Sequence, residues 1–129
     1  MELITLLTVL FTKHILADYF LQRAWMFPDK GVYGAWGGVS HAGIHGILTT
    51  LVLFGFTDIQ TAIILGWLDF FLHYHIDYVK TNVWKNKNLT STDSLYWMIH
   101  GTDQFAHFLT YVLIAVSYTH LTLPTILLV

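Results

Sequence analysis

The chain has 129 residues, of which 55% are hydrophobic and only 11% are charged, whereas soluble domains carry about 25% charged residues. So few charged groups cannot cover a soluble surface, and this length fits one domain with lipid as its outer solvent. The formal net charge of −2, without a basic run or a glycine-rich phosphate loop, argues against a nucleic-acid partner. The absence of cysteine excludes disulfides, thiolate metal sites and cysteine nucleophiles.

Four apolar segments are long enough to cross a bilayer of about 30 Å at about 1.5 Å of helical rise per residue. In chain order they are Leu3 to Gln22, Trp36 to Phe56, Ile59 to Lys80 and Ser94 to Val116. The start of the chain, Met1 to Leu10, lacks the positive charge of a signal peptide, so we expect it to be retained as the first span. The sequence therefore predicts an all-α integral membrane bundle of about four transmembrane helices with no sheet.

The connections between these segments differ in character. Residues 23–35 contain proline and two glycines and are typical of a loop. Residues 57–58 form a tight turn in which Asp58 can cap the third helix. Residues 81–93 read as a polar loop that ends in a cap at Asp93 or Ser94.

Lysine and arginine predict the orientation. Arg23 and Lys30 flank the first loop, and Lys80, Lys85 and Lys87 lie at the third, whereas the second loop has neither residue type. By the positive-inside rule, the first and third loops are cytoplasmic and the N-terminus is outside, as in a multi-pass protein of a bacterial inner membrane. Lys13 lies within the first span and must therefore snorkel or find a partner.

The last residues of the chain resemble a sequence that is not part of a natural protein. Residues 116–125 read VSYTHLTLPT, and all ten resemble one reading frame of a transposase-based sequencing adaptor. We therefore expect a four-helix transmembrane domain over residues 1–115 and a non-native tail over 116–129, so His120 is left out of the site. The alternative is a native, proline-ended helix tail.

Ionisable residues recur within each span at a spacing of four, which places both members of a pair on one helix face. The pairs are His14 with Asp18, His41 with His45, His73 with Asp77, and Asp103 with His107. Measured from the first or third loop, most of these residues lie about 5 to 14 Å deep at helical rise. Since the chain reverses direction after each span while the polar groups return to one depth, we expect them to converge in the bundle interior near the cytoplasmic face.

Such groups are costly against lipid and should therefore face inward and pair. Imidazole and carboxylate are also donors that zinc, iron and manganese accept, and helical bundles hold such sites between facing helices. The eight residues are enough for one or two divalent metal ions. The alternative is that these side chains only join the helices by hydrogen bonds.

Other polar, aromatic and small residues have simpler interpretations. His75 and His100 are expected to be interfacial or to support the site from outside it. Four tryptophans, at positions 25, 36, 84 and 97, are typical of an interfacial belt. Gly43, Gly46 and Gly66 are expected to allow close helix approach.

At these residues the chain resembles the bacterial and phage membrane proteins grouped as domain-of-unknown-function family 3307. The matching pieces are HILADYFLQRAW from His14, HAGIH from His41, HYHIDYVK from His73 and DQFAH from Asp103, in an overall match of about Leu3 to Val112. The resemblance strengthens the site and names no reaction, because the family has no established activity. The pattern is also loosely similar to membrane-bound metal-dependent hydrolases.

The leading hypothesis is a metal-dependent hydrolase that acts on a lipid headgroup or phosphate ester near the cytoplasmic face, with zinc or a two-metal centre activating water. Asp18 or Asp77 would be the base and Lys80 would hold the anion, unless Lys80 is an ordinary snorkelling lysine. One alternative is a proton or metal conduit or transporter. Another is a structural or haem-binding bundle with histidines as axial ligands.

Overall fold

The computed structural model describes the backbone of residues 2–126, and all of its regular elements are helices, with no strand in that range. Its elements in chain order are α1 (Glu2–Leu16), the π-helical turn η1 (Ala17–Leu21), α2 (Met26–Asp29), α3 (Trp36–Leu53), α4 (Ile59–Asn86) and α5 (Ser94–Ile126). The predicted all-α class is therefore confirmed for the described residues. Residues 127–129 of the predicted non-native tail lie outside the described residues, and the origin of that tail stays a prediction.

The predicted helix ends are partly wrong. The first and second segments agree with α1–η1 and α3 to within three residues. However, α4 continues to Asn86 rather than Lys80, and α5 continues to Ile126 rather than Val116. The short helix α2, within the predicted first loop, was not expected. The polar run after Lys80 stays helical because its apolar members pack: the Trp84 ring stacks on Tyr96 of α5 with centroids 4.1 Å apart.

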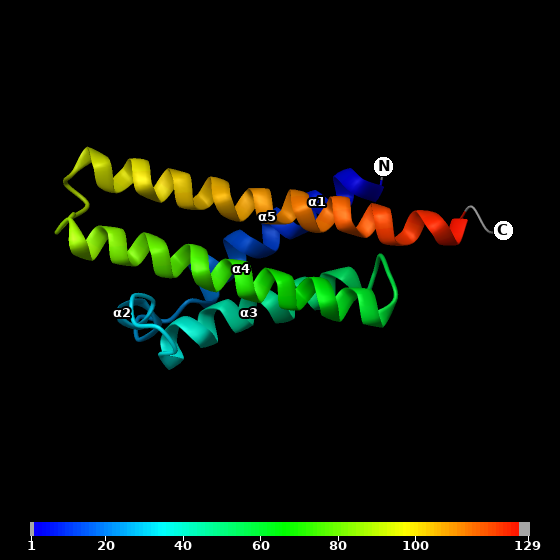
Figure 1. Ribbon diagram of the computed structural model, residues 1–129, viewed down its shortest axis with the longest axis horizontal. Coiled ribbons are helices and arrows are strands. Elements are labelled where there is room, and N and C mark those ends of the chain that lie inside the picture. Colours follow the sequence, from blue (N-terminus) through cyan, green and yellow to red (C-terminus); the bar gives the residue numbers. More distant parts are fainter. Residues whose placement is uncertain (1, 127–129) are drawn as a thin grey trace.

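The four long helices form an antiparallel bundle, with α2 beside the connection that leads into α3 (Figure 1). Helix α4 packs against both α3 and α5, and α1 contacts α3 and α5. The α4–α5 connection lies at the same end of the bundle as α2, and the N-terminal end of α1 lies toward the other end (Figure 1). This arrangement places the first and third connections at one end.

Close contact between α3 and α4 depends on glycine. A Cβ added to Gly46 would lie 2.9 Å from the carbonyl oxygen of Gly66, and one added to Gly66 would lie 2.8 Å from that of Gly46. Two of the three expected close-approach glycines are thus confirmed, and the expectation is wrong for Gly43, whose added Cβ would meet nothing within 4 Å. The tight crossing brings the polar faces of α3 and α4 together.

The turn between α3 and α4 follows the predicted capping chemistry. Asp58 accepts a hydrogen bond from the backbone N–H of Thr61 at 3.0 Å. This bond holds the pKa of Asp58 below its usual range, because it favours the ionised carboxylate. The predicted cap at the start of α4 is therefore confirmed.

The interior is divided into an apolar half and a polar half. Near the N-terminal end of α1, the core is built from Leu6, Leu10, Leu53, Tyr111 and Ile114 together with neighbouring apolar residues. Toward the α2 end, the buried residues are mostly histidine, aspartate and lysine. The bundle therefore keeps its ionisable groups at one level.

Much of the outer surface is apolar. Large hydrophobic side chains are exposed on every long helix, among them Ile4, Ile47, Trp67, Phe71 and Phe105. By length and apolar composition, one helical segment of the described chain, Glu2–Leu21, has the character of a membrane span. Among the described residues, the other three expected spans do not have this character, and they carry the larger part of the buried polar residues, so the four-span arrangement stays a prediction.

Candidate functional site

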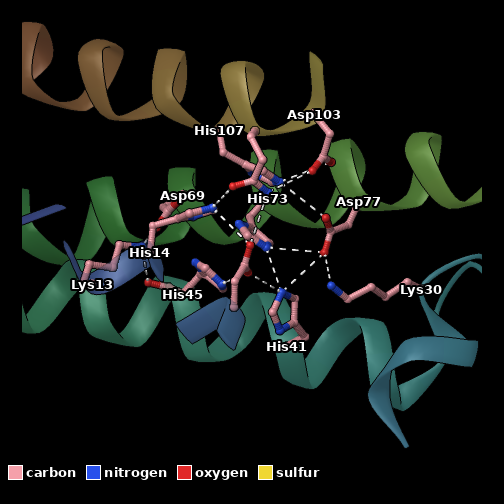
Figure 2. A network of polar contacts seen from close by, with 12 residues as sticks. Lys13, His14, Lys30, His41, His45, Asp69, His73, Asp77, Asp103 and His107 are labelled. Atoms are coloured by element: carbon pink, nitrogen blue, oxygen red, sulfur yellow. Dashed lines mark hydrogen bonds and ion pairs between the residues drawn. The ribbon is translucent and has the colours of Figure 1, made fainter. Parts of the chain in front are cut away.

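All eight predicted polar residues converge in one interior cluster. They come from α1 (His14), η1 (Asp18), α3 (His41, His45), α4 (His73, Asp77) and α5 (Asp103, His107). Figure 2 shows the labelled members of this set pointing toward one another from the facing helices. The histidines are at most 1% exposed. The predicted convergence is confirmed, while the metal-binding and catalytic roles of these residues stay predictions.

Asp18 is the meeting point of three histidines from two segments of the chain. Its Oδ1 atom lies 3.0 Å from Nε2 of His45 and 3.2 Å from Nε2 of His41, and its Oδ2 atom lies 3.2 Å from Nε2 of His14. The side chain stays 16% exposed, unlike those of the histidines. A π-helical turn carries Asp18, and such turns are frequent at functional sites.

Asp77 is a second meeting point, on α4. Its Oδ2 atom lies 2.6 Å from Nζ of Lys30 and 3.4 Å from Nε2 of His41, and its Oδ1 atom lies 3.3 Å from Nζ of Lys80. Nε2 of His107 lies 3.4 Å from both Asp77 Oδ1 and Asp103 Oδ1. The ammonium of Lys80 also donates to Asp103 at 2.8 Å. Lys80 therefore points into the cluster, and the snorkelling interpretation of this lysine is wrong.

The imidazole rings are packed closely. The rings of His45 and His73 stack with centroids 3.6 Å apart, and those of His73 and His107 stack at 4.1 Å. Nε2 of His41 lies 3.1 Å from Nε2 of His73. Within the described residues, Nδ1 of His41, His45 and His73 has no hydrogen-bond partner. These three imidazoles therefore make their polar contacts through Nε2, which faces the cluster.

Three overlapping sets of donor atoms could hold a metal ion. They are Asp18 with His41, His45 and His73; His14 with His73 and His107; and Asp77 with Asp103 and His107, the donor atoms of each set lying within 4.8 Å of one another. His73 and His107 each belong to two sets. The donors are thus close enough to serve one ion or two neighbouring ions.

The spacing of the donor atoms fits a divalent metal. Bonds of about 2.0–2.2 Å in tetrahedral geometry separate neighbouring donors by about 3.3–3.6 Å. Within the first donor set, His41 Nε2 lies 3.2 Å from Asp18 Oδ1 and 3.1 Å from His73 Nε2. A neutral imidazole nitrogen can take part in one good hydrogen bond, so it cannot satisfy both of these neighbours as a donor or acceptor alone. Borderline nitrogen and oxygen donors of this kind suit zinc, iron or manganese.

A second buried ion pair lies beside the cluster. Nζ of Lys13 lies 2.6 Å from Oδ2 of Asp69 and donates to the carbonyl oxygen of His45 at 3.2 Å. The hydroxyl of Thr49 donates to the same Asp69 oxygen at 2.5 Å. Lys13, which was expected either to snorkel or to find a partner, therefore has a partner in Asp69. Its hydrogen bond to the carbonyl of His45 also links this ion pair to the turn of α3 that contains His45.

An open cavity leads from the surface to the cluster. It has a volume of about 490 Å³ and lies between η1, α2 and the adjoining ends of α4 and α5. Its lining includes Asp18, Lys30 and Lys80 together with Trp84 and Trp97. The cavity therefore gives a small molecule access to one carboxylate of the cluster and to two ammonium groups.

Three participants were missed from the sequence. The role of Asp69 could have been predicted from the sequence. An aspartate inside a predicted span requires a cation as partner, and Lys13 is the unpaired cation at the same depth in the bundle. The sequence indicates only a role in membrane orientation for Lys30, and nothing in its spacing indicates that it is buried beside α2. Tyr111, whose hydroxyl lies 2.8 Å from Nδ1 of His14, gave no signal.

The remaining histidines and tryptophans are placed around the cluster. His75 lies off the shared face of α4, with Nε2 3.1 Å from the hydroxyl of Tyr33. His100 lines the cavity. Trp25, Trp36 and Trp97 are more than half exposed, whereas Trp84 is half-buried in the cavity wall.

Comparison with protein families identifies the chain. Its residues 6–128 match a family described as protein of unknown function, DUF3307. The chain belongs to the DUF3307 family. The match includes all eight cluster residues and confirms the predicted resemblance to this family, while the looser similarity to membrane-bound metal-dependent hydrolases stays a prediction. Comparisons with curated proteins and with solved structures give no match.

Proposed function

We propose that this DUF3307 protein is a membrane-embedded, metal-dependent hydrolase of phosphate esters that opens toward the cytoplasmic face. The main support for the proposal is one cavity, in which Asp18 of the buried histidine–aspartate donor set lies together with two lysines, Lys30 and Lys80. A divalent metal held by that set would supply Lewis-acid chemistry and an activated water. Zinc is the first candidate, and the overlap of donor sets also suits two ions.

The proposed reaction is hydrolysis at phosphorus. The oxygen of water forms a bond to phosphorus, the bond from phosphorus to the ester oxygen breaks, and a proton passes to the leaving alcohol. Asp18 is the preferred base because it lies both in the cavity and in the cluster. Asp77 is the alternative base. Lys80 and Lys30 would hold the phosphate oxygens.

Charge supports an anionic substrate. The carboxylates of Asp77 and Asp103 face the ammonium groups of Lys30 and Lys80, and Asp18, which contacts histidines, lines the same cavity as both lysines. These groups carry one net negative charge when the histidines are neutral. One bound divalent ion reverses that sign, and a second makes the site more positive still. The loaded site would then attract a phosphate, and carboxylates engaged by metal would leave the lysines free to bind it.

The membrane placement is supported by an inverted distribution of polarity. Ionisable side chains are buried at one level of the bundle while aromatic and aliphatic side chains cover the outside. An exterior with large apolar side chains exposed on every long helix is unusual for a soluble monomer. In lipid it is the expected surface, and the buried charges are then the functional groups.

The topology yields a direct prediction. Reporter fusions placed after Lys30 and after Lys87 should both give the cytoplasmic signal, because both connections lie at one end of the bundle and carry the lysines. A fusion after Thr57 should give the opposite signal. Opposite signals from the first two fusions would contradict the four-span arrangement.

Phosphate release tests the reaction. Purified full-length protein loaded with zinc or manganese should release phosphate from p-nitrophenyl phosphate. Asp77→Asn should reduce the rate by at least about 100-fold, since it removes a donor or base from the centre. Asp93→Asn, a matched change in the exposed loop before α5, should keep the wild-type rate. Absence of phosphate release with zinc, manganese and magnesium would refute the proposal.

The alternatives have less support. A conduit across the membrane needs a polar path that continues from the cluster to the other end of the bundle. In that direction, toward the N-terminal end of α1, the described residues instead form the apolar core around Leu6, Leu10 and Ile114. A haem between axial histidines needs a wide gap between facing rings. The histidine rings of the cluster instead pack with centroids of 3.6 to 5.6 Å.

A further inference from the structure

A second opening reaches the site from the outer face of the bundle. An apolar groove of about 490 Å³ runs between α4 and α5 and is lined by Leu72, Ile76, Val79, Val83, Ile99 and Ala106, among others. Its charged members are Lys80 and Asp103, which form an ion pair at 2.8 Å. Lys80 also lines the cavity beside Asp18. One ammonium group therefore stands where an apolar groove and a polar cavity meet.

We infer that the site takes an amphiphile with a phosphate headgroup, whose acyl chain lies in the α4–α5 groove while the phosphate binds Lys80 and Lys30. The role of this amphiphile as substrate rests on the proposed function. Val79 is 59% exposed, so a chain can enter the groove sideways from the surrounding lipid. A soluble phosphate ester would use the cavity alone.

The α4–α5 groove differs from a second apolar groove because charged side chains line it. A second apolar groove, of about 480 Å³ between α3 and α4, is lined by Val39, Ile47, Ile63 and their neighbours, with no lysine, arginine or acidic residue. Any lipid can fill such a groove, because lipid tails are as apolar as the helix surface and nothing anchors the headgroup. Of these two grooves, only the α4–α5 groove ends at a cation that also faces the proposed reaction site.

The aromatic wall of the cavity fits the headgroup end of an amphiphile. Nζ of Lys80 lies 5.3 Å from the centre of the Trp84 ring, and Trp97 lines the same cavity. Tryptophan favours the boundary between headgroups and acyl chains. The cavity mouth therefore matches the depth at which a phosphate headgroup lies, while the groove continues into the acyl-chain region.

The test compares two tryptophan substitutions at exposed β-branched residues. Detergent-purified wild type should retain dioleoyl phosphatidic acid over dioleoyl phosphatidylcholine by at least tenfold in native mass spectrometry. Val79→Trp should fill the α4–α5 groove and reduce the retention of phosphatidic acid by at least tenfold. Ile47→Trp, which fills the groove between α3 and α4, should keep the wild-type value. The Lys80→Met variant should lose the binding of phosphatidic acid and also the binding of inorganic phosphate, which is measured by calorimetry.

The outcomes separate this inference from the hydrolase proposal. If Val79→Trp weakens phosphatidic acid binding but not inorganic phosphate binding, the groove holds the chain as inferred. Equal retention of the two lipids by wild type, or wild-type retention of phosphatidic acid by Val79→Trp, would overturn the inference even if phosphate release is observed. Selective retention of phosphatidic acid without any phosphate release would instead refute the hydrolase and leave the lipid site standing.

Discussion

His73→Ala should reduce the affinity of the purified protein for zinc by more than 100-fold. His73 belongs to two of the three donor sets and stacks between His45 and His107. Loss of outer groups around a metal site typically costs about 10- to 100-fold in affinity, and loss of a direct donor should exceed that range. The measurement is competition with a chromophoric chelator, combined with elemental analysis after dialysis.

A matched histidine on the same helix provides the control. His75 lies two residues away but bonds to Tyr33 rather than to the cluster. His75→Ala should therefore leave the zinc affinity unchanged. His45→Ala and Asp77→Ala should both lower it. If these two variants bind as much metal as wild type, the metal assignment fails while the convergence of the side chains stands.

Asp69→Asn should lower the free energy of unfolding by about 3–5 kcal/mol, the cost of leaving a buried charge without its partner. Asp69 is 1% exposed and pairs with Lys13, which is 5% exposed. The substitution leaves the Lys13 ammonium beside an amide that cannot balance its charge. Equilibrium unfolding in mixed micelles, followed by tryptophan fluorescence, measures the change.

Two further variants test the cause of that loss. Lys13→Met combined with Asp69→Leu removes both charges and should recover most of the lost stability, because a buried pair can be replaced by apolar side chains of similar size. Asp93→Asn, in the exposed loop, should change the free energy of unfolding by less than about 0.5 kcal/mol. A double variant as unstable as Asp69→Asn would show that the stability depends on something other than charge balance.

The cluster was predictable because its information is local. His14 with Asp18 and His73 with Asp77 lie four residues apart, and that spacing fixes a shared helix face whatever the fold. Alternation of the chain direction then brings pairs at one depth together. Neither step needs knowledge of which helix packs against which, so the convergence followed from the sequence without the structure.

Features that depend on packing between distant segments were not predictable in the same way. Lys30 reaches Asp77 because α2 packs against α3 and thereby brings Lys30 to the cluster. Residues 81–86 have the composition of a loop but remain helical, since Trp84 gains a stacking partner in Tyr96 that lies 12 positions away in the sequence. The π-helical turn at Asp18 likewise has no signature in residue spacing.

X-ray absorption at the zinc edge of the purified full-length protein tests the metal centre most directly. We expect at least one zinc ion per chain, with nitrogen and oxygen donors at about 2.0–2.2 Å and the outer-shell scattering of several imidazoles. That scattering should weaken in His73→Ala and persist in His75→Ala. A wild-type protein that holds no metal after zinc loading, or zinc surrounded by oxygen donors alone, would show that the histidine–aspartate cluster is not a zinc centre.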